Sequence, residues 1–369
     1  MVNSRHLDFI DGLRGLAIFG VIYHHLFWHK TSPGFGALSI GGAELHPFTL
    51  LSNGWMGVNL FFFLSGFVLY YPYISSKRTL QNTVDLKDFY YRRAKRLLPL
   101  FYFNVFVSAF LIPQAPGAED FYEKLLLVCT FTNIFTLEYY ITPFNFVLWS
   151  LALELWFSLL FPLVVFLFNR FGYKIVVSAV VIISLGTRIY GLDESFQLRG
   201  TDYLNPVRDS IFGRLDDFVL GMLCCYVCVS NRVKFITTYN AYLFTLTGFI
   251  LGLAACLLWD SVVLERSSLG TVPYINIVLN IAFFLVVVSL YRSNNLLNRL
   301  CENWPIMLLG MMCYSLYVWH GVILMSIMRL GMKDFGLPAF FLALLVIGTL
   351  SYRYIEFGHI RDSKRLFRL

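Results

Sequence analysis

The feature that most constrains this chain is a series of apolar runs, each about 20 residues long, that recurs along the whole sequence. An α-helix needs a run of about that length to cross the hydrocarbon core of a bilayer. Hydrophobic residues make up 58% of the chain and charged residues only 14%, a composition far from that of soluble domains. The sequence therefore predicts an integral membrane protein of the all-α class.

About ten of these runs are predicted to span the membrane. They lie near residues 9–29, 54–73, 97–113, 147–168, 173–191, 211–230, 241–259, 273–291, 306–328 and 336–357. A shorter apolar run at residues 123–138 is expected to be re-entrant or to lie in the membrane interface. The predicted fold is a polytopic helix bundle that forms a single membrane domain over residues 1–369, with no appended soluble domain.

The distribution of basic residues predicts the orientation of the chain. If residues 123–138 do not cross, the basic connections, such as 77–96 and the tail after 357, all fall on one side. Because cytoplasmic loops are enriched in Lys and Arg, both termini are expected in the cytoplasm. The same rule accounts for the net charge of +7, so membrane lipid and not nucleic acid is the expected neighbour. The seven cysteines lie in or beside apolar runs and fit no disulfide framework or metal-ligand spacing, so we expect no metal.

Polar residues within the spans are the candidate functional residues. In "IDGLRGLAIFGVIYHHLFWH", Arg14 and His25 are separated by ten residues, which places them on one helical face, roughly 16 Å apart along the axis. His24 points about 80° away from that face. Arg14 could simply extend to the lipid headgroups, and His25 could simply pack between helices. Ionisable groups at membrane depth are nevertheless functional by default.

A second group lies in "FYYRRAKRLLPLF", directly before a predicted span. Arg93 and Arg96 are three residues apart and therefore neighbours on a helix surface. One interpretation is a topology signal that contacts anionic lipid. The alternative is a phosphate clamp, because paired guanidinium groups match phosphate oxygens well.

Three further segments place polar residues inside spans. In "VLWSLALELWF", Ser150 and Glu154 share a face, and the carboxylate needs a partner that a histidine or an arginine could supply. Arg214 and Asp217 lie one helical turn apart in "GRLDDFVLGML". His320 lies among aromatic residues in "YSLYVWHGVIL", where a packed core histidine and a functional one are equally consistent with the sequence.

These segments, taken together and in this order, resemble a known family. The blocks are "LDFIDGLRGLAIFGVIYHH", "GWMGVNLFFFLSGFVL", "FYYRRAKRLLPLF", "WSLALELWF", "GRLDDFVLGML", "YSLYVWHGVIL" and "SYRYIE". They are similar to those of membrane-bound acyltransferase family 3, which includes bacterial polysaccharide O-acetyltransferases such as those that act on lipopolysaccharide O-antigen. The resemblance extends over nearly the whole chain.

The resemblance implies a bacterial cytoplasmic (inner) membrane enzyme that moves an acyl group, commonly acetyl from cytoplasmic acetyl-coenzyme A, to a sugar hydroxyl at the outer face. The acceptor would be a carbohydrate, in some cases linked to lipid. The Arg and His motif of the family falls on Arg14 and His25, and its R-x-x-R motif on Arg93 and Arg96. Its serine and glutamate fall on Ser150 and Glu154.

Two positions depart from the family pattern. Leu155 stands where the family has a second glutamate, and Phe357 follows the final Glu356 where proline is common. Some members carry a fused hydrolase-like domain. Because this chain ends about 12 residues after its last predicted span, we expect it to act alone or with a separate extracytoplasmic transferase.

A mechanism follows from the residues and the resemblance together. His25 is the expected general base, since a neutral imidazole can accept a hydroxyl proton near pH 7. Glu154 could orient the His25 ring, while Arg14, Arg93 and Arg96 would bind the phosphates of the coenzyme. Ser150, Arg214, Asp217 and His320 are expected to bind substrate or support these groups. The alternative function is a transporter or flippase that uses the same buried residues as a proton relay.

Overall fold

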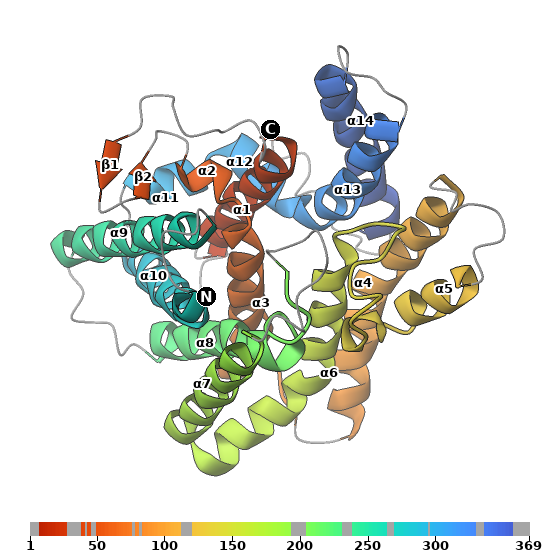
Figure 1. Ribbon diagram of the computed structural model, residues 1–369. Coiled ribbons are helices and arrows are strands. Elements are labelled where there is room, and N and C mark those ends of the chain that lie inside the picture. Colours follow the sequence, from red (N-terminus) through yellow and green to blue (C-terminus); the bar gives the residue numbers. More distant parts are fainter. Residues whose placement is uncertain are drawn as a thin grey trace. The chain divides into compact units, whose positions relative to one another are not determined.

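The structure is a computed structural model of the chain. It describes residues 7–27, 38–40, 43–45, 49–75, 78–80, 83–111, 120–192, 204–230, 238–263, 269–293, 296–329 and 336–356. These residues are almost entirely helical (Figure 1), which confirms the predicted all-α polytopic bundle. A two-stranded antiparallel hairpin, β1 (Leu38–Ile40) and β2 (Ala43–Leu45), is an addition that the sequence did not predict.

The chain divides into two compact units, Met1–Leu80 with Leu159–Met311, and Gln81–Ser158 with Met312–Leu369. The helices of the first unit are α1 (Asp8–Phe27), α2 (Thr49–Ser52), α3 (Met56–Ile74), α7 (Tyr173–Tyr190), α8 (Ile211–Val229), α9 (Thr238–Val263), the short η4 (Leu269–Thr271), α10 (Val272–Arg292), α11 (Leu296–Cys301) and α12 (Trp304–Met311). Those of the second are α4 (Thr83–Leu111), α5 (Phe121–Cys129), the short η2 (Asn133–Phe135), α13 (Cys313–Arg329), α14 (Gly336–Ser351) and a π-helical turn (Tyr352–Glu356). The boundary between the units falls within α6 (Leu148–Phe171).

In the part of the chain that the structure describes, seven helices are long and apolar enough to cross a membrane, and an eighth is counted if α12 and α13 form one bent span. The remaining two predicted spans correspond to α1 and α8, which have 20 and 19 residues. Both are long enough to cross, but each carries charged side chains in its N-terminal half, which lower the hydropathy of the segment. The total of ten therefore stays a prediction.

The segment 123–138 does not form a spanning helix. Its helical part, α5, has only nine residues, or about 13 Å at the rise of an α-helix, which is less than half the hydrocarbon thickness. The chain then continues through η2 and a series of turns until α6 begins. This conformation agrees with the predicted re-entrant or interfacial segment.

Helix packing in the first unit depends on close backbone approach. A Cβ added at Gly66 of α3 would lie 1.9 Å from the carbonyl oxygen of Phe218 in α8, and one at Gly221 of α8 would lie 1.9 Å from that of Phe63. Only glycine permits this contact, which is the usual function of small residues between membrane helices. Gly66 and Gly221 therefore allow α3 and α8 to pack with their backbones in close contact.

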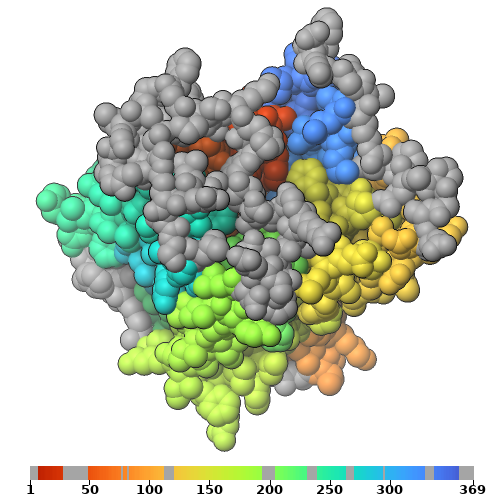
Figure 2. Space-filling view, viewed as in Figure 1, coloured from red at the N-terminus to blue at the C-terminus, as the bar shows by residue number. Residues whose placement is uncertain are grey.

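Large apolar side chains also lie on outward-facing helix surfaces. On α9, Leu246, Phe249 and Ile250 are all exposed, and this helix lies at the surface of the molecule in the space-filling view (Figure 2). A soluble protein rarely exposes such a continuous apolar face. In a bilayer, lipid covers it, so the exposed apolar residues agree with membrane insertion.

Candidate functional site

The first candidate group lies on α1, which is a single unbroken helix. Arg14 and His25 therefore share a helical face as the sequence predicts. Arg14 Nη1 lies 3.6 Å from Asp11 Oδ1, one turn earlier, and His25 is partly buried. The rings of His24 and His25 have centroids 5.4 Å apart in an edge arrangement. His29 lies outside the described residues.

His24 has a clear structural partner. Its Nδ1 donates a hydrogen bond to the carbonyl oxygen of Ser52 at 2.5 Å, because a carbonyl can only accept. Ser52 ends α2, so His24 fixes the last turn of α1 against the segment that leads into α3. His24 therefore has a role in packing α1 against the turn that precedes α3.

The turn between α2 and α3, which follows Ser52, contacts α9 as well as α1. Asn53 Nδ2 donates to both carboxylate oxygens of Asp260, at 3.1 and 2.9 Å, and Trp55 Nε1 donates to Asn53 Oδ1 at 2.8 Å. The rings of Trp55 and Trp259 have centroids 5.1 Å apart. The sequence analysis did not identify this group, since Asn53 and Asp260 are separated by 207 positions and no local pattern relates them.

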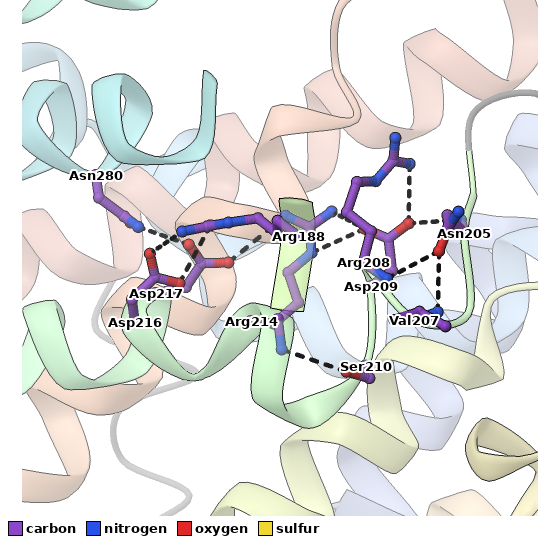
Figure 3. Close-up of polar contacts among 11 residues, drawn as sticks. Arg188, Asn205, Val207, Arg208, Asp209, Ser210, Arg214, Asp216, Asp217 and Asn280 are labelled. Carbon is purple, nitrogen blue, oxygen red and sulfur yellow. Dashed lines mark hydrogen bonds and ion pairs between the residues drawn. The ribbon is translucent and has the colours of Figure 1, made fainter. Parts of the chain in front are cut away.

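A second candidate group is a fully buried network of charged residues between α7, α8 and α10 (Figure 3). Arg188 of α7 forms two hydrogen bonds with Asp216 of α8, at 3.3 and 2.6 Å, and both side chains are 0% exposed. The side-chain amide of Asn276 in α10 faces the same arginines, and with its oxygen turned toward them Oδ1 accepts from Arg214 Nη1 at 2.6 Å and from Arg188 Nη1 at 3.1 Å.

The sequence-predicted pair Arg214 and Asp217 belongs to the same network, but its principal contacts are with other residues. Arg214 donates to Asp209 Oδ1 through Nε at 3.0 Å and Nη2 at 2.5 Å, and its Nη1 lies 3.6 Å from Asp217 Oδ2. Asp217 Oδ1 accepts from Asn280 Nδ2 at 2.6 Å. Asp217 Oδ2 has no hydrogen-bond partner in the described structure.

Asp209 lies at the edge of this network and pairs with two of its arginines. It also accepts from Arg208 Nη2 at 3.0 Å and from the backbone N–H of Asn205 at 2.8 Å. Burial alone would raise the pKa of Asp209, but Arg208 and Arg214 together with the Asn205 N–H hold it below the ordinary value. The carboxylate is therefore ionised and holds the arginine at the start of α8 in place.

Sequence reasoning found only part of this network. Arg188 lies in the last turn of α7 and Asp216 in the first half of α8, and a charged residue inside each apolar run was the available signal. Their pairing required the tertiary structure. In the described part of the chain, no group of three or more His, Cys, Asp or Glu side chains could hold a metal ion.

The third candidate group lies in the second unit, between α4 and α6. Arg93 Nη2 donates to Glu154 Oε1 at 2.5 Å, and Arg93 also donates to Ser158 Oγ through Nε at 3.1 Å and Nη2 at 2.9 Å. The sequence allowed either a histidine or an arginine as the partner of Glu154, and in the structure the partner is Arg93. Both side chains are largely buried, at 14% and 16% exposure.

Arg96 does not share this environment. Its side chain is exposed, whereas Arg93 is directed into α6. Tyr314 of α13 donates to the carbonyl oxygen of Leu97 at 2.6 Å and interacts electrostatically with Glu356, Arg93, Arg96 and Glu154. The two arginines predicted as a phosphate clamp therefore differ: Arg93 is held by Glu154 and Ser158, and Arg96 is exposed.

The remaining predicted residues form a buried cluster around α13. Ser150 Oγ and Tyr317 Oη form a hydrogen bond of 2.6 Å. His320 is fully buried, and its Nδ1 donates to the carbonyl oxygen of Tyr317 at 2.6 Å. This contact within its own helix agrees with the packed-core interpretation of His320. In α8, Cys224, Cys225 and Cys228 are buried free thiols.

These features define a class of protein: a polytopic helical membrane protein with ionisable groups paired inside its helices and at their ends, where such groups are usually functional. The chain belongs to membrane-bound acyltransferase family 3, because the model of the acyltransferase domain matches residues 7–352. The resemblance inferred from the sequence blocks is therefore confirmed.

Two relatives from Staphylococcus aureus strain COL illustrate the similarity. "O-acetyltransferase OatA" is 26% identical over 383 residues, and "Putative O-acetyltransferase SACOL0978" is 24% identical over 381 residues. In both cases the alignment covers 96% of this chain and 57% of the relative. The chain thus spans little more than half the length of these relatives. No solved structure matches it.

Proposed function

We propose that the protein transfers an acyl group, acetyl from cytoplasmic acetyl-coenzyme A, to a hydroxyl of a carbohydrate at the outer face of the membrane. The observation that carries this proposal is the continuity of α1, which holds Arg14 and His25 on one face, roughly 16 Å apart along the axis. An extended pantetheine arm could reach from a phosphate contact at Arg14 to a thioester beside His25. Family membership and the two named relatives support acyl transfer.

The chemical step assigned to His25 is general base catalysis. The imidazole accepts the proton of the sugar hydroxyl while the oxygen forms a bond to the thioester carbonyl carbon. The carbon–sulfur bond then breaks and the acetyl group remains on the sugar oxygen. The leaving thiolate takes the proton from the imidazolium, which gives free coenzyme A and restores the neutral imidazole. Atoms and charge balance without a metal or a redox partner.

The arginines are proposed to bind the phosphates of the donor. Arg96 is exposed and available for such a contact, while Glu154 and Ser158 hold the Arg93 guanidinium in a fixed orientation. In this proposal Glu154 acts as a positioning residue for Arg93. Bidentate guanidinium contacts to phosphate are among the stronger polar interactions available to proteins.

The proposal is tested with the purified full chain in nanodiscs, supplied with acetyl-coenzyme A labelled in the acetyl group. Release of free thiol together with transfer of label to a glycoside, both lost in His25→Ala, is the expected result. A protein that binds acetyl-coenzyme A but never releases thiol with any acceptor, and that instead moves an intact solute across the bilayer, would contradict acyl transfer.

A further inference from the structure

The turn between α2 and α3 joins three helix ends of the first unit. A Cβ added at Gly54 would lie 1.9 Å from the carbonyl oxygen of Gly20, so the turn packs directly on α1. Ser52 accepts from His24 on the same helix, and Asn53 donates to Asp260 at the end of α9. In the predicted topology these three helix ends lie on the outer side.

Asp260 is an unusual carboxylate within this group. It is partly buried, and its hydrogen bonds come from the neutral amide of Asn53. Among the residues that the structure describes, no Lys, Arg or His forms an ion pair with it. A carboxylate that has lost part of its hydration needs hydrogen-bond donors. Asn53 Nδ2 also donates to the carbonyl oxygen of Thr49 at 3.1 Å, which leaves one N–H group for the two oxygens of Asp260. The carboxylate therefore retains capacity to accept more hydrogen bonds.

Aromatic rings lie beside this carboxylate. Trp55 is partly exposed, and it is fixed by its hydrogen bond to Asn53 and by its contact with Trp259. The guanidinium of Arg208 lies over the Trp259 ring, with Cζ 5.6 Å from the ring centroid. A carboxylate acceptor next to a rigid indole matches a pyranose, which presents hydroxyl donors at its edge and apolar C–H groups on its face.

The charges in the group select among ligand classes. Asp260 disfavours a phosphate or a carboxylate ligand by like-charge repulsion. Arg208, over the neighbouring indole, disfavours a second cation such as an ammonium group. A neutral ligand with several hydroxyl groups satisfies both conditions.

We propose that Asp260 and Trp55, positioned by Asn53, bind a neutral pyranose of the acceptor with its hydroxyl groups toward Asp260. This proposal rests on the proposed function, because the bound sugar would be the one that receives the acyl group. The same turn accepts a hydrogen bond from His24 through Ser52, and the His24 ring contacts that of His25, so the subsite is linked to the end of α1 that carries the proposed general base. Asn53 acts as a positioning residue that does not itself contact the sugar.

The test uses the full chain in nanodiscs with octyl glucoside, octyl galactoside and octyl N-acetylglucosaminide as acceptor probes. Asp260→Asn keeps the size of the side chain and removes its charge. We expect it to raise the KM for the accepted glycoside about tenfold or more, since the lost contact is charge-assisted, while acetyl-coenzyme A affinity is unchanged. Asp120→Asn, at an exposed carboxylate paired with Lys124 in the second unit, is the matched control and should change neither value.

Deoxy analogues of the accepted glycoside separate recognition from a purely structural effect. Removing the hydroxyl that contacts Asp260 should raise the KM of the wild-type protein and leave that of Asp260→Asn almost unchanged. If every deoxy analogue affects both proteins equally, or if the KM for the glycoside is the same in both, the subsite assignment is wrong.

Binding is measured separately from catalysis, by quenching of intrinsic tryptophan fluorescence on titration with the same glycosides. His25→Ala should bind glycoside normally and transfer no acetyl group. Glycoside binding by a wild-type protein that transfers no acetyl group would remove the proposed function and retain the carbohydrate site. Absence of binding by all three probes would overturn the carbohydrate site itself.

Discussion

At the residue scale, the two neighbouring histidines of α1 offer the most direct test of the chemistry. His25→Ala is expected to lower the rate of acyl transfer by about 10²–10⁴, the usual effect of removing a general base, with acetyl-coenzyme A affinity retained. His24→Ala removes the hydrogen bond to Ser52, which is worth about 0.5–1.5 kcal/mol of stability. The effect of His24→Ala should therefore appear mainly as a lower thermal midpoint, with only a small change in the rate of acyl transfer.

Transfer rates and donor affinities of both variants, measured in the same nanodisc preparation, decide the assignment. Equal rate losses in the two variants, or an active His25→Ala enzyme, would exclude His25 as the base. His24→Gln, which keeps a hydrogen-bond donor in the side chain, is a control for the structural role of His24.

The two aspartates at the centre of the buried network should respond differently to the same change. Asp216→Asn leaves the fully buried Arg188 without its ion partner, and breaking a buried pair in this way costs roughly 3–5 kcal/mol. Asp217→Asn can still accept the hydrogen bond from Asn280, so its expected cost is about 1 kcal/mol or less. Denaturant unfolding in detergent measures both.

A combined variant tests whether the first effect comes from the ion pair. Arg188→Met with Asp216→Leu removes both charges, and such replacements are often neutral or stabilising. The double variant should be more stable than Asp216→Asn alone. If Asp216→Asn and Asp217→Asn destabilise the protein equally, the stability of the fold does not depend on the ion pair between Arg188 and Asp216.

At the element scale, the junction of α4 and α6 gives the two arginines separate tests. Arg96→Ala removes an exposed guanidinium, so it should weaken acetyl-coenzyme A binding by about 1.5–3 kcal/mol without loss of stability. Arg93→Ala leaves Glu154 buried without its partner, so it should reduce both binding and stability. Isothermal titration with acetyl-coenzyme A and a thermal melt distinguish the two effects.

If Arg96→Ala leaves donor affinity unchanged but lowers membrane insertion or expression, the basic segment is a topology signal and the phosphate clamp is wrong. Lys95→Ala is the matched control, because Lys95 is equally exposed on the same helix. Its charge is part of the topology signal and not of the proposed clamp.

The sequence predicted elements well where one rule decided them. Apolar length located α3, α6, α7, α9 and α10 close to their observed bounds, whereas α4 begins at Thr83, well before the predicted start of its span at residue 97. The charged groups were less predictable, because Arg188 pairs with Asp216 across 28 positions and Asn53 with Asp260 across 207. Helical spacing relates residues within one turn or a few turns of a helix, so it assigned Arg214 to Asp217 and missed the closer contact of Arg214 with Asp209.

At the scale of the whole molecule, the orientation in the membrane is a prediction that reporter tags can test. A tag at residue 369 and one in the connection at 75–88 should both report cytoplasm, and one at 260–270 should report the outside. The basic connections predict this result through the positive-inside rule. An outward C-terminus would mean that the segment containing α5 crosses, and every later connection would then invert.

The buried pair of Arg188 and Asp216 also has a consequence for how the chain enters the bilayer during synthesis. An unpaired Arg or Asp within a helix opposes translocon insertion, by about 2.5–3.5 kcal/mol at the helix centre and by less toward the ends. Because α7 and α8 are consecutive helices, the charges of Arg188 and Asp216 can neutralise each other. We expect the two helices to leave the translocon as a hairpin. Glycosylation mapping in microsomes should then show α8 inserting efficiently after α7, and poorly when Arg188 is replaced by leucine.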